Sequence, residues 1–196
     1  MNDQTGEERS GRKLVLYTLM SLDGAVDYPN QYFAQGRSGG PPEFDADMEA
    51  NEAAVTGASD AVLLGRHMYD EWSKFWPTVP DEPFAQFINN VKKYVVTSTP
   101  LSNDWPNAEA VHGPIAEIVA GLKAQPGGDI GVHGSIQLAQ SLLAEGLVDE
   151  LRLVIGPAFG FGGRRLFGSV ADVRRLELLS AQPTQNGSLL LAYRVP

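Results

Sequence analysis

The chain of 196 residues is 43% hydrophobic and 20% charged, a globular composition long enough to bury a core. Its formal net charge of −9 argues against a sequence-independent nucleic-acid binder, because phosphate neutralisation needs a basic surface. The sequence has no cysteine, which excludes disulfides, thiolate catalysis and cysteine-ligated metals.

The chain begins with a polar and charged stretch, residues 1–11, that lacks the apolar core of a signal peptide. We expect this stretch to be a disordered extension and residues 12–196 to form one domain. No apolar run approaches the length needed to cross a membrane, so we expect a cytoplasmic protein with no membrane partner.

Apolar runs and helical patterns alternate along the first half of the domain. Residues 13–20 are almost continuously apolar, as in a strand that is covered on both faces. Residues 21–42 form the longest loop, of a size usual for lids, binding loops or disordered insertions. The elements expected next are a helix at 43–56, a strand at 60–64, a helical turn through Tyr69 and Trp72, a short helix at 84–89 and a strand at 94–97.

The second half continues the alternation and ends in a hairpin. The expected elements are a helix starting at Pro114, a strand at 129–133, a helix at 135–145, a strand at 150–155 and two strands at 176–180 and 188–193. Asn186-Gly187, between the last two strands, is a strong signal for a hairpin turn. The sequence therefore predicts an α/β fold with a mainly parallel sheet that ends in an antiparallel hairpin.

Two apolar runs end in glycine and lead directly into a helical pattern, at Gly65 and at Gly134. Such junctions present unpaired helix N–H groups, and the positive end of the helix dipole, beyond the strand. Two of them in one domain can hold a polyanion such as a dinucleotide. Neither junction carries the GxxxxGK[ST] loop or the full GxGxxG fingerprint.

Five short motifs occur in an order that resembles dihydrofolate-reductase-like proteins. They are Ser21-Leu22-Asp23-Gly24, Leu64-Gly65-Arg66-His67-Met68-Tyr69, Val96-Thr97-Ser98, His133-Gly134-Ser135 and Gly162-Gly163-Arg164-Arg165-Leu166-Phe167. The chain is most similar to the reductase domain of the riboflavin-pathway deaminase–reductase, especially its stand-alone homologues. This resemblance implies a three-layer sandwich, a homodimer, and NADPH-dependent reduction of a pyrimidine- or pterin-like heterocycle, as in 5-amino-6-(5-phosphoribosylamino)uracil reductase.

The resemblance also implies where NADPH binds. The matching positions are Gly65, Arg66, His67, Thr97, Ser98, Gly134, Ser135, Ile136 and Gln137. Arg66 offers a forked donor for phosphate, and we expect it to pair with the 2′-phosphate that distinguishes NADPH from NADH. The alternative is that Gly65 is a plain turn and Arg66 a surface cation. Small hydroxyl residues such as those at positions 97, 98 and 135 also serve as turn formers and helix caps.

At the substrate end, the resemblance indicates Tyr17, Ser21 and Asp23 as substrate-binding residues. Asp23 and Asp47 are the candidate catalytic residues, because a buried carboxylate near the hydride acceptor has a raised pKa and can deliver a proton. Glu43 is a further candidate beside Asp47. The alternative is that the acids of the helix at 43–56 form its solvated face, and that Asp23 is a turn residue before a glycine.

Several residues depart from the riboflavin reductases. Tyr17 stands where they carry a lysine, His133 stands where a small residue is usual, and Arg37 is the sole cation between residues 24 and 42. A ribityl-phosphate substrate is therefore in doubt. A flatter, more apolar substrate fits Tyr17 and the aromatic residues that follow it, unless those residues are core packing: Tyr28, Tyr32, Phe33, Trp72 and Trp76.

The remaining residues of chemical interest leave two functions open besides reduction of a riboflavin-type heterocycle. The histidines show no metal-ligand spacing with carboxylates, so we expect no metal site, and His133 is expected to be structural or to support a neighbouring site residue, and not to be catalytic. The glycines and arginines of residues 160–167 either clasp a phosphate or position the last strands, and we favour the architectural role. The alternative functions are a non-catalytic NADPH-binding sensor or partner protein, and dihydrofolate reductase activity.

Overall fold

The computed structural model describes residues 11–33, 43–79, 81–160, 162–168 and 172–196. The predicted extension at residues 1–11, apart from Gly11, and residues 34–42 of the predicted long loop lie outside this described part of the chain. Within the described residues, no helix is both long and apolar enough to cross a membrane.

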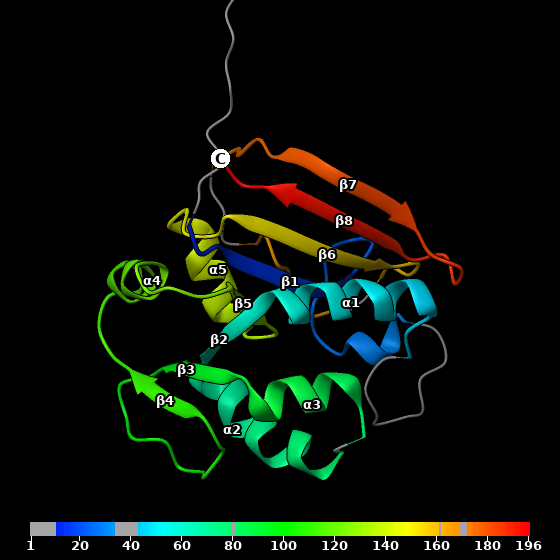
Figure 1. Cartoon of the computed structure of the whole chain (residues 1–196). Coiled ribbons are helices and arrows are strands. Elements are labelled where there is room, and N and C mark those ends of the chain that lie inside the picture. Colours follow the sequence, from blue (N-terminus) through cyan, green and yellow to red (C-terminus); the bar gives the residue numbers. More distant parts are fainter. Residues whose placement is uncertain (1–10, 34–42, 80, 161, 169–171) are drawn as a thin grey trace, which may run out of the picture.

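The described residues form an eight-stranded sheet in the order β4-β3-β2-β5-β1-β6-β8-β7 (Figure 1). The strands are β1 (Leu14–Ser21), β2 (Ser59–Gly65), β3 (Lys92–Val96), β4 (Ala108–Val111), β5 (Asp129–His133), β6 (Glu150–Gly156), β7 (Glu177–Pro183) and β8 (Leu189–Arg194). Strands β1 to β6 pair in parallel, whereas β8 is antiparallel to both β6 and β7. The predicted parallel sheet with a C-terminal antiparallel hairpin is confirmed.

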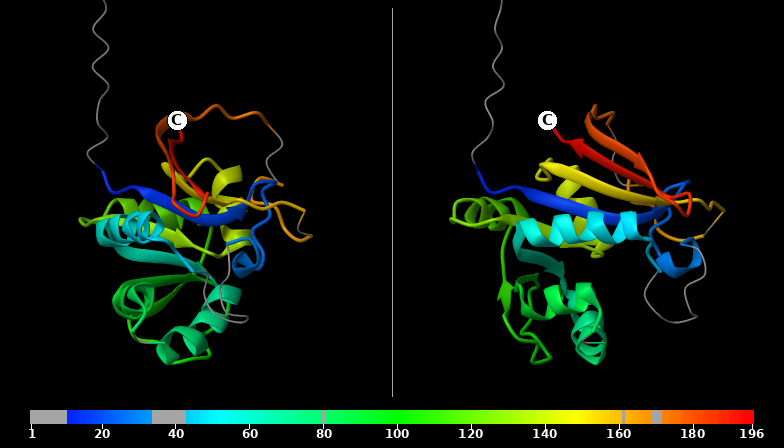
Figure 2. Two further views of the ribbon diagram at one scale, coloured as in Figure 1. Left: turned by 90° about the vertical axis from the view of Figure 1, so that its right-hand side faces the viewer. Right: turned by 45° about the vertical axis from the view of Figure 1, so that its right-hand side comes forward.

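Helices cover both faces of this sheet and make three layers. They are α1 (Ala46–Ala58), α2 (Arg66–Phe75), α3 (Pro83–Asn90), α4 (Ile115–Lys123) and α5 (Ile136–Ala144). Helices α1, α2 and α3 pack on one face, and α4 and α5 pack on the other. Figure 1 shows α1 in front of the sheet and α5 behind it, and Figure 2 shows the same layers from two other sides.

The central position of strand β1 in the sheet explains why its sequence is almost continuously apolar. Leu14 and Leu16 pack into the cluster that contains α4 and α5, whereas Val15 and Tyr17 pack into the cluster that contains α1. All four side chains are at most 4% exposed. A central parallel strand needs apolar residues on both faces, so its sequence is a continuous apolar run. A half-exposed strand would instead alternate apolar and polar residues.

Two of the differences between the observed and the predicted elements have a clear local cause. Strand β4 was not predicted, because a four-residue edge strand with an exposed Glu109 is too short to show a pattern. Helix α1 begins at Ala46 and not at Glu43, because Asp45 is its N-cap and its Oδ1 accepts the Met48 amide proton at 3.0 Å.

Lys93 is a fully buried cation in strand β3. Its ammonium group donates hydrogen bonds of 2.8 Å to the carbonyl oxygens of Ile88 and Val91, at the C-terminal end of α3. It also lies 4.6 Å from the ring centre of Trp105. Burial, with a smaller contribution from Lys92, lowers the pKa of Lys93 to about 8. Lys93 therefore fastens the last turn of α3 to the sheet.

Candidate active site

A cleft of about 2050 Å³ opens beside the ends of the central strands. It is lined by residues from β1, β2 and β5 and from α1, α2, α3 and α5. The chain leaves β1 toward α1 on one face and leaves β5 toward α5 on the other, so the connections diverge between these neighbouring strands. Open α/β sheets bind their ligands at such a switch point.

The two glycine-ended junctions meet at one end of this cleft. The Gly65 amide, just before α2, donates a hydrogen bond of 2.9 Å to the Ser135 hydroxyl, just before α5. Ser135 stands at the N-cap position of α5, yet its hydroxyl serves the neighbouring junction and not its own helix. Neither helix has a side-chain cap among the described residues. Two uncapped helix N-termini therefore lie side by side, an arrangement suited to a diphosphate.

Gly65 and Gly134 differ in whether the fold requires a glycine at that position. Gly134 has a φ of +68°, and a Cβ there would lie 2.7 Å from Met68 Cε and 3.1 Å from Trp72 Cζ2. Gly134 is therefore required by the packing of α2 against the β5–α5 turn. Gly65 has a φ of −80°, and a Cβ there would meet protein atoms only at an ordinary 3.7 Å. The fold does not require glycine at position 65, where an added Cβ would make ordinary contacts with Ser135 and with Leu138 of α5.

Arg66, the predicted phosphate ligand, is held by protein groups at the edge of the cleft. Its Nε donates to both carboxylate oxygens of Asp70, at 2.9 and 2.8 Å, and its Nη1 donates to Thr99 Oγ1 at 2.6 Å. Thr97 belongs to the same cluster, with its Oγ1 3.5 Å from Nη1 of Arg66. The structure thus brings Arg66 and Thr97 together at the start of α2, with the guanidinium paired to a carboxylate.

The other predicted cofactor residues are placed unequally. Ile136 and Gln137 line the cleft at the start of α5, beside Ser135. His67 also lines the cleft but is exposed, and its Nε2 lies 3.4 Å from Glu71. Ser98 is exposed beside Thr97 and is not among the residues that line the cleft.

Along the wall of the same cleft, several buried polar groups lack partners within the described part of the protein. The Tyr17 hydroxyl, both ring nitrogens of His133 and the Trp76 indole nitrogen make no hydrogen bond. These side chains are only 4%, 3% and 9% exposed, and all three residues line the cleft. Buried polar groups are normally satisfied, so groups left open in a cleft indicate ligand contacts.

These side chains belong to one continuous aromatic wall. Tyr17 and His133 are register partners on β1 and β5, with ring centres 5.5 Å apart. Phe84 of α3 lies 5.4 Å from His133 and 4.9 Å from Trp76, also measured between ring centres. Burial lowers the pKa of His133 to about 4, so the imidazole is neutral near pH 7. His133, expected to have a structural or supporting role, lies in the cleft wall.

Carboxylates from two elements face this wall. Glu49 and Glu52 of α1 and Glu82, the residue before α3, all line the cleft. Burial, with the nearby charges of Glu82 and Glu49, raises the pKa of Glu52 to about 7. Burial, with a contribution from Glu52, also raises the pKa of Tyr17 well above its usual range. Glu52 is therefore the carboxyl group that exchanges a proton near neutral pH, and the sequence prediction did not single it out.

The predicted catalytic residue Asp23 is held by protein groups outside the cleft. Its carboxylate accepts hydrogen bonds from Ser21 Oγ at 2.6 Å and from the Gly160 amide at 3.2 Å, and it pairs with Arg165 at 2.8 Å. Hydrogen bonds from Ser21 and Arg165 lower the pKa of Asp23 to about 2. Neither Ser21 nor Asp23 lines the cleft. Both residues fasten the turn after β1 to the segment that begins at residue 160, and the structure gives Asp23 no proton to deliver.

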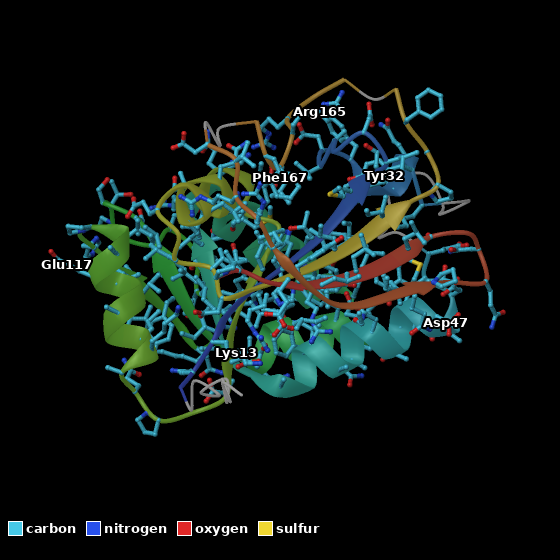
Figure 3. All side chains as sticks on the ribbon, turned by 90° about the horizontal axis from the view of Figure 1, so that it is seen from above. Lys13, Tyr32, Asp47, Glu117, Arg165 and Phe167 are labelled. Carbon is cyan, nitrogen blue, oxygen red and sulfur yellow. The ribbon has the colours of Figure 1, made fainter. Side chains whose placement is uncertain are left out.

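The predicted catalytic residue Asp47 also lies away from the cleft. It is on the flank of α1 beside the β7–β8 hairpin, where its Oδ1 is 3.5 Å from Gln182 Nε2 (Figure 3). It is not among the cleft-lining residues, and neither is the neighbouring N-cap, Asp45. Glu43, in contrast, lines the cleft near the start of α1.

The arginines that follow Gly163 have structural partners. Arg164 Nε donates to Asp27 Oδ1 at 3.0 Å, and Arg165 pairs with Asp23. Arg165 also forms an isolated β-bridge with Ala25. These contacts agree with the architectural role expected for residues 160–167, within the described residues. In that same part of the chain, no group of three or more His, Asp or Glu residues is arranged to hold a metal ion.

Comparison with known proteins identifies relatives of this fold. Residues 12–190 match the RibD C-terminal domain. The uncharacterized Bacillus subtilis protein YyaP is 28% identical over 187 residues, covering 93% of this chain and 94% of YyaP. A pyrimidine reductase-like protein from Corynebacterium diphtheriae has a TM-score of 0.67 at 17% identity, covering 94% and 92% of the two chains. A dihydrofolate reductase from Enterococcus faecalis, solved with NADP(H), has a TM-score of 0.62 at 16% identity, covering 94% and 98%.

Proposed function

Because this chain belongs to the RibD C-terminal domain family, a riboflavin-pathway-like reductase family with a dihydrofolate-reductase-like fold, we propose that it is an NADPH-dependent reductase of a pyrimidine- or pterin-like heterocycle. The hydrogen bond between the Gly65 amide and the Ser135 hydroxyl is the observation that carries this proposal. It sets two uncapped helix N-termini side by side in a cleft whose wall also carries unpartnered polar groups.

The cofactor end fits the diphosphate of NADPH. The first-turn amides of α2 and α5 would hold the diphosphate, and the absence of a side chain at Gly65 lets it approach the backbone. Arg66 and Thr97 would contact the 2′-phosphate at the edge of the cleft. NADPH supplies a hydride when it is bound, and the protein supplies orientation and electrostatics.

The proton that accompanies the hydride needs a source in the protein. Reduction of a C=N or C=O bond adds one hydride to carbon and one proton to the heteroatom. We assign this proton to Glu52, because its carboxyl group lines the cleft and holds a proton near neutral pH. Asp23 and Asp47 do not line the cleft, so neither replaces Glu52 in this proposal.

A cofactor titration followed by turnover assays tests the proposal. Trp72 and Trp76 both line the cleft, so their fluorescence should change when NADPH fills it. We expect saturable binding of NADPH, weaker binding of NADH, and NADPH oxidation with at least one oxidised pyrimidine or pterin. If neither cofactor binds, the proposal fails.

The same assays separate the alternative functions. Tight NADPH binding without oxidation in the presence of any heterocycle or small carbonyl compound identifies a non-catalytic sensor. Turnover with dihydrofolate as the preferred substrate identifies a dihydrofolate reductase. Tyr17, which stands where riboflavin reductases carry a lysine, is the feature that keeps both alternatives in the test.

A further inference from the structure

The charges that line the cleft are strongly one-sided. Among the described residues, its cationic side chains are Arg66 and Arg164, and each is paired with an acid that also lines the cleft, Asp70 and Asp27. The substrate end adds Glu49, Glu52 and Glu82, for which the described part of the chain offers no cationic partner. Among the described residues that line the cleft, a phosphate group placed here would meet carboxylates and no unpaired arginine or lysine, which is electrostatically unfavourable.

Buried polar groups without protein partners among the described residues lie in the same cleft as these carboxylates. The Tyr17 hydroxyl, the His133 ring nitrogens and the Trp76 indole nitrogen are more than nine-tenths buried and lack protein partners. Tyr17 is close enough to Glu52 to feel its charge. The open donors and acceptors, the carboxylates and the aromatic wall therefore belong to one compartment.

The shape of this compartment fits a flat ring. One wall is the ring series of Tyr17, His133, Phe84 and Trp76, with neighbouring ring centres 4.9 to 5.5 Å apart. Beside this wall, α1 adds the small side chains of Ala46, Ala50 and Ala53 to the cleft lining at helical spacing. The large rings offer a flat apolar surface on which an aromatic ligand can stack.

From these observations we infer that the substrate end of the cleft recognises a flat, cationic nitrogen heterocycle that carries no phosphate. Tyr17, His133 and Trp76 bind its polar edge, and the carboxylates of Glu49 and Glu82 balance its positive charge. This inference rests on the proposed function in naming the compartment as the substrate end of a reductase. It names the substrate class by charge, and it separates this protein from enzymes that act on phosphorylated heterocycles.

The test uses three compounds of matched shape and different charge, added to the whole protein without NADPH. 4-Aminoquinoline is protonated on its ring nitrogen at neutral pH, 1-aminonaphthalene is its neutral counterpart, and 1-naphthyl phosphate is an anion. Calorimetric titration should show that 4-aminoquinoline binds at least tenfold more tightly than 1-aminonaphthalene, with no measurable binding of 1-naphthyl phosphate. Equal affinities, or a preference for the phosphate, would overturn the inference.

Variants connect that preference to the named residues. The double variant Glu49→Gln and Glu82→Gln should reduce the preference for 4-aminoquinoline at least fivefold and leave the affinity for 1-aminonaphthalene unchanged. Glu117→Gln is the matched control, because Glu117 is an exposed residue of α4 at the periphery of the molecule (Figure 3). If the control and the double variant behave alike, the cluster does not set the preference.

A polar-edge variant and a cofactor titration complete the design. Tyr17→Phe removes a hydroxyl that has no protein partner, so it should weaken 4-aminoquinoline several-fold without lowering the melting temperature. An unchanged affinity would remove Tyr17 from the site. NADPH titration of the same preparations tests the proposed function separately, since its failure would leave the charge preference in place.

Discussion

The backbone amide of Gly65 and the side chain of Ser135, seventy positions apart in the chain, are joined by a hydrogen bond of 2.9 Å. This contact ties the loop before α2 to the loop before α5. The starts of both helices therefore move as a unit, and a ligand held by one is also positioned by the other.

The contrast between the two glycines leads to a first prediction. Gly65→Ala should fold normally, because the new Cβ makes only ordinary contacts, but it should weaken NADPH about tenfold or more by blocking the approach of the diphosphate. Thermal unfolding and fluorescence titration measure the two effects. Gly121→Ala, on α4 with open space around its Cα, should leave NADPH binding unchanged.

Gly134→Ala should behave in the opposite way. Its positive φ and the clash with Met68 and Trp72 predict a loss of stability of about 1–3 kcal/mol. A Gly134→Ala protein with an unchanged melting temperature would contradict this account of the α2 packing.

The pairing of Arg66 with Asp70 predicts how the protein selects NADPH. Arg66→Ala should weaken NADPH by roughly 1.5–3 kcal/mol and NADH very little, because the 2′-phosphate loses a charge-assisted partner. Asp70→Asn should tighten NADPH several-fold, since it removes the carboxylate that competes for the guanidinium. Parallel titrations with both cofactors test this, and equal losses for NADPH and NADH in Arg66→Ala would refute the assignment.

The two flanks of α1 predict different effects on turnover. Glu52→Gln should lower kcat at least tenfold without weakening NADPH, because it removes the proposed proton source from the cleft. Asp47→Asn should leave kcat unchanged, because Asp47 faces Gln182. Steady-state kinetics give kcat for both variants. A loss of kcat in Asp47→Asn, with no loss in Glu52→Gln, would indicate Asp47 as the proton donor.

Glu52 also predicts a pH dependence of stability. Its pKa is raised from 4.5 to about 7 in the folded protein, so the folded state binds the proton more tightly than the unfolded chain. Its contribution to stability is then complete below pH 4.5 and is lost as the pH rises to about 7. Glu52→Gln should therefore gain stability relative to the parent protein above pH 7, on the order of 2 kcal/mol. Denaturant unfolding at pH 5 and pH 8 measures the gain.

His133 should act in the opposite direction. Burial lowers its pKa from 6.5 to about 4, so the unfolded chain binds the proton more readily than the folded protein. Stability should fall as the pH drops from about 6.5 to 4, and His133→Phe should remove this part of the acid sensitivity. A variant with the same acid profile as the parent would show that other groups dominate.

The exposed edge of the sheet predicts the oligomeric state. Strand β7 lies at the edge, and it carries Leu178 and Leu179 at 54% and 40% exposure. Edge strands with apolar side chains are prone to pair with another chain. We expect light scattering to give the mass of a homodimer and Leu178→Lys to shift it toward the monomer. A monomeric parent protein would contradict the dimer that the family resemblance implies.

The sequence allowed the fold to be predicted because its strands and turns carry local signals. The apolar run of β1, the glycine-ended junctions at Gly65 and Gly134, and the Asn186-Gly187 turn all depend on nearby residues. Strand β4 lacked such a signal. Lys93 breaks the apolar pattern of β3 in the sequence. Its burial could not be predicted, because the carbonyl groups that accept its hydrogen bonds lie at the end of α3 and are brought to it by the fold.

The proton source was harder to predict because it depends on which flank of α1 faces the cleft. At about 100° per residue, Met48 and Val55 mark the side of the helix that packs on the sheet, and Asp47 and Glu52 lie on opposite flanks of that side. Sequence periodicity gives the arrangement of side chains around α1, but it does not show which elements lie next to each flank. Only the position of α3 and of Glu82 shows that the flank of Glu52 lines the cleft.

The anchoring of α3 by Lys93 has a mechanical consequence. Helix α3 carries Phe84, and Glu82 immediately precedes it. Because Lys93 holds the last turn of α3 to the sheet, this side of the cleft is anchored to the sheet. The aromatic side of the cleft is therefore expected to keep its position when a bulky reactant enters.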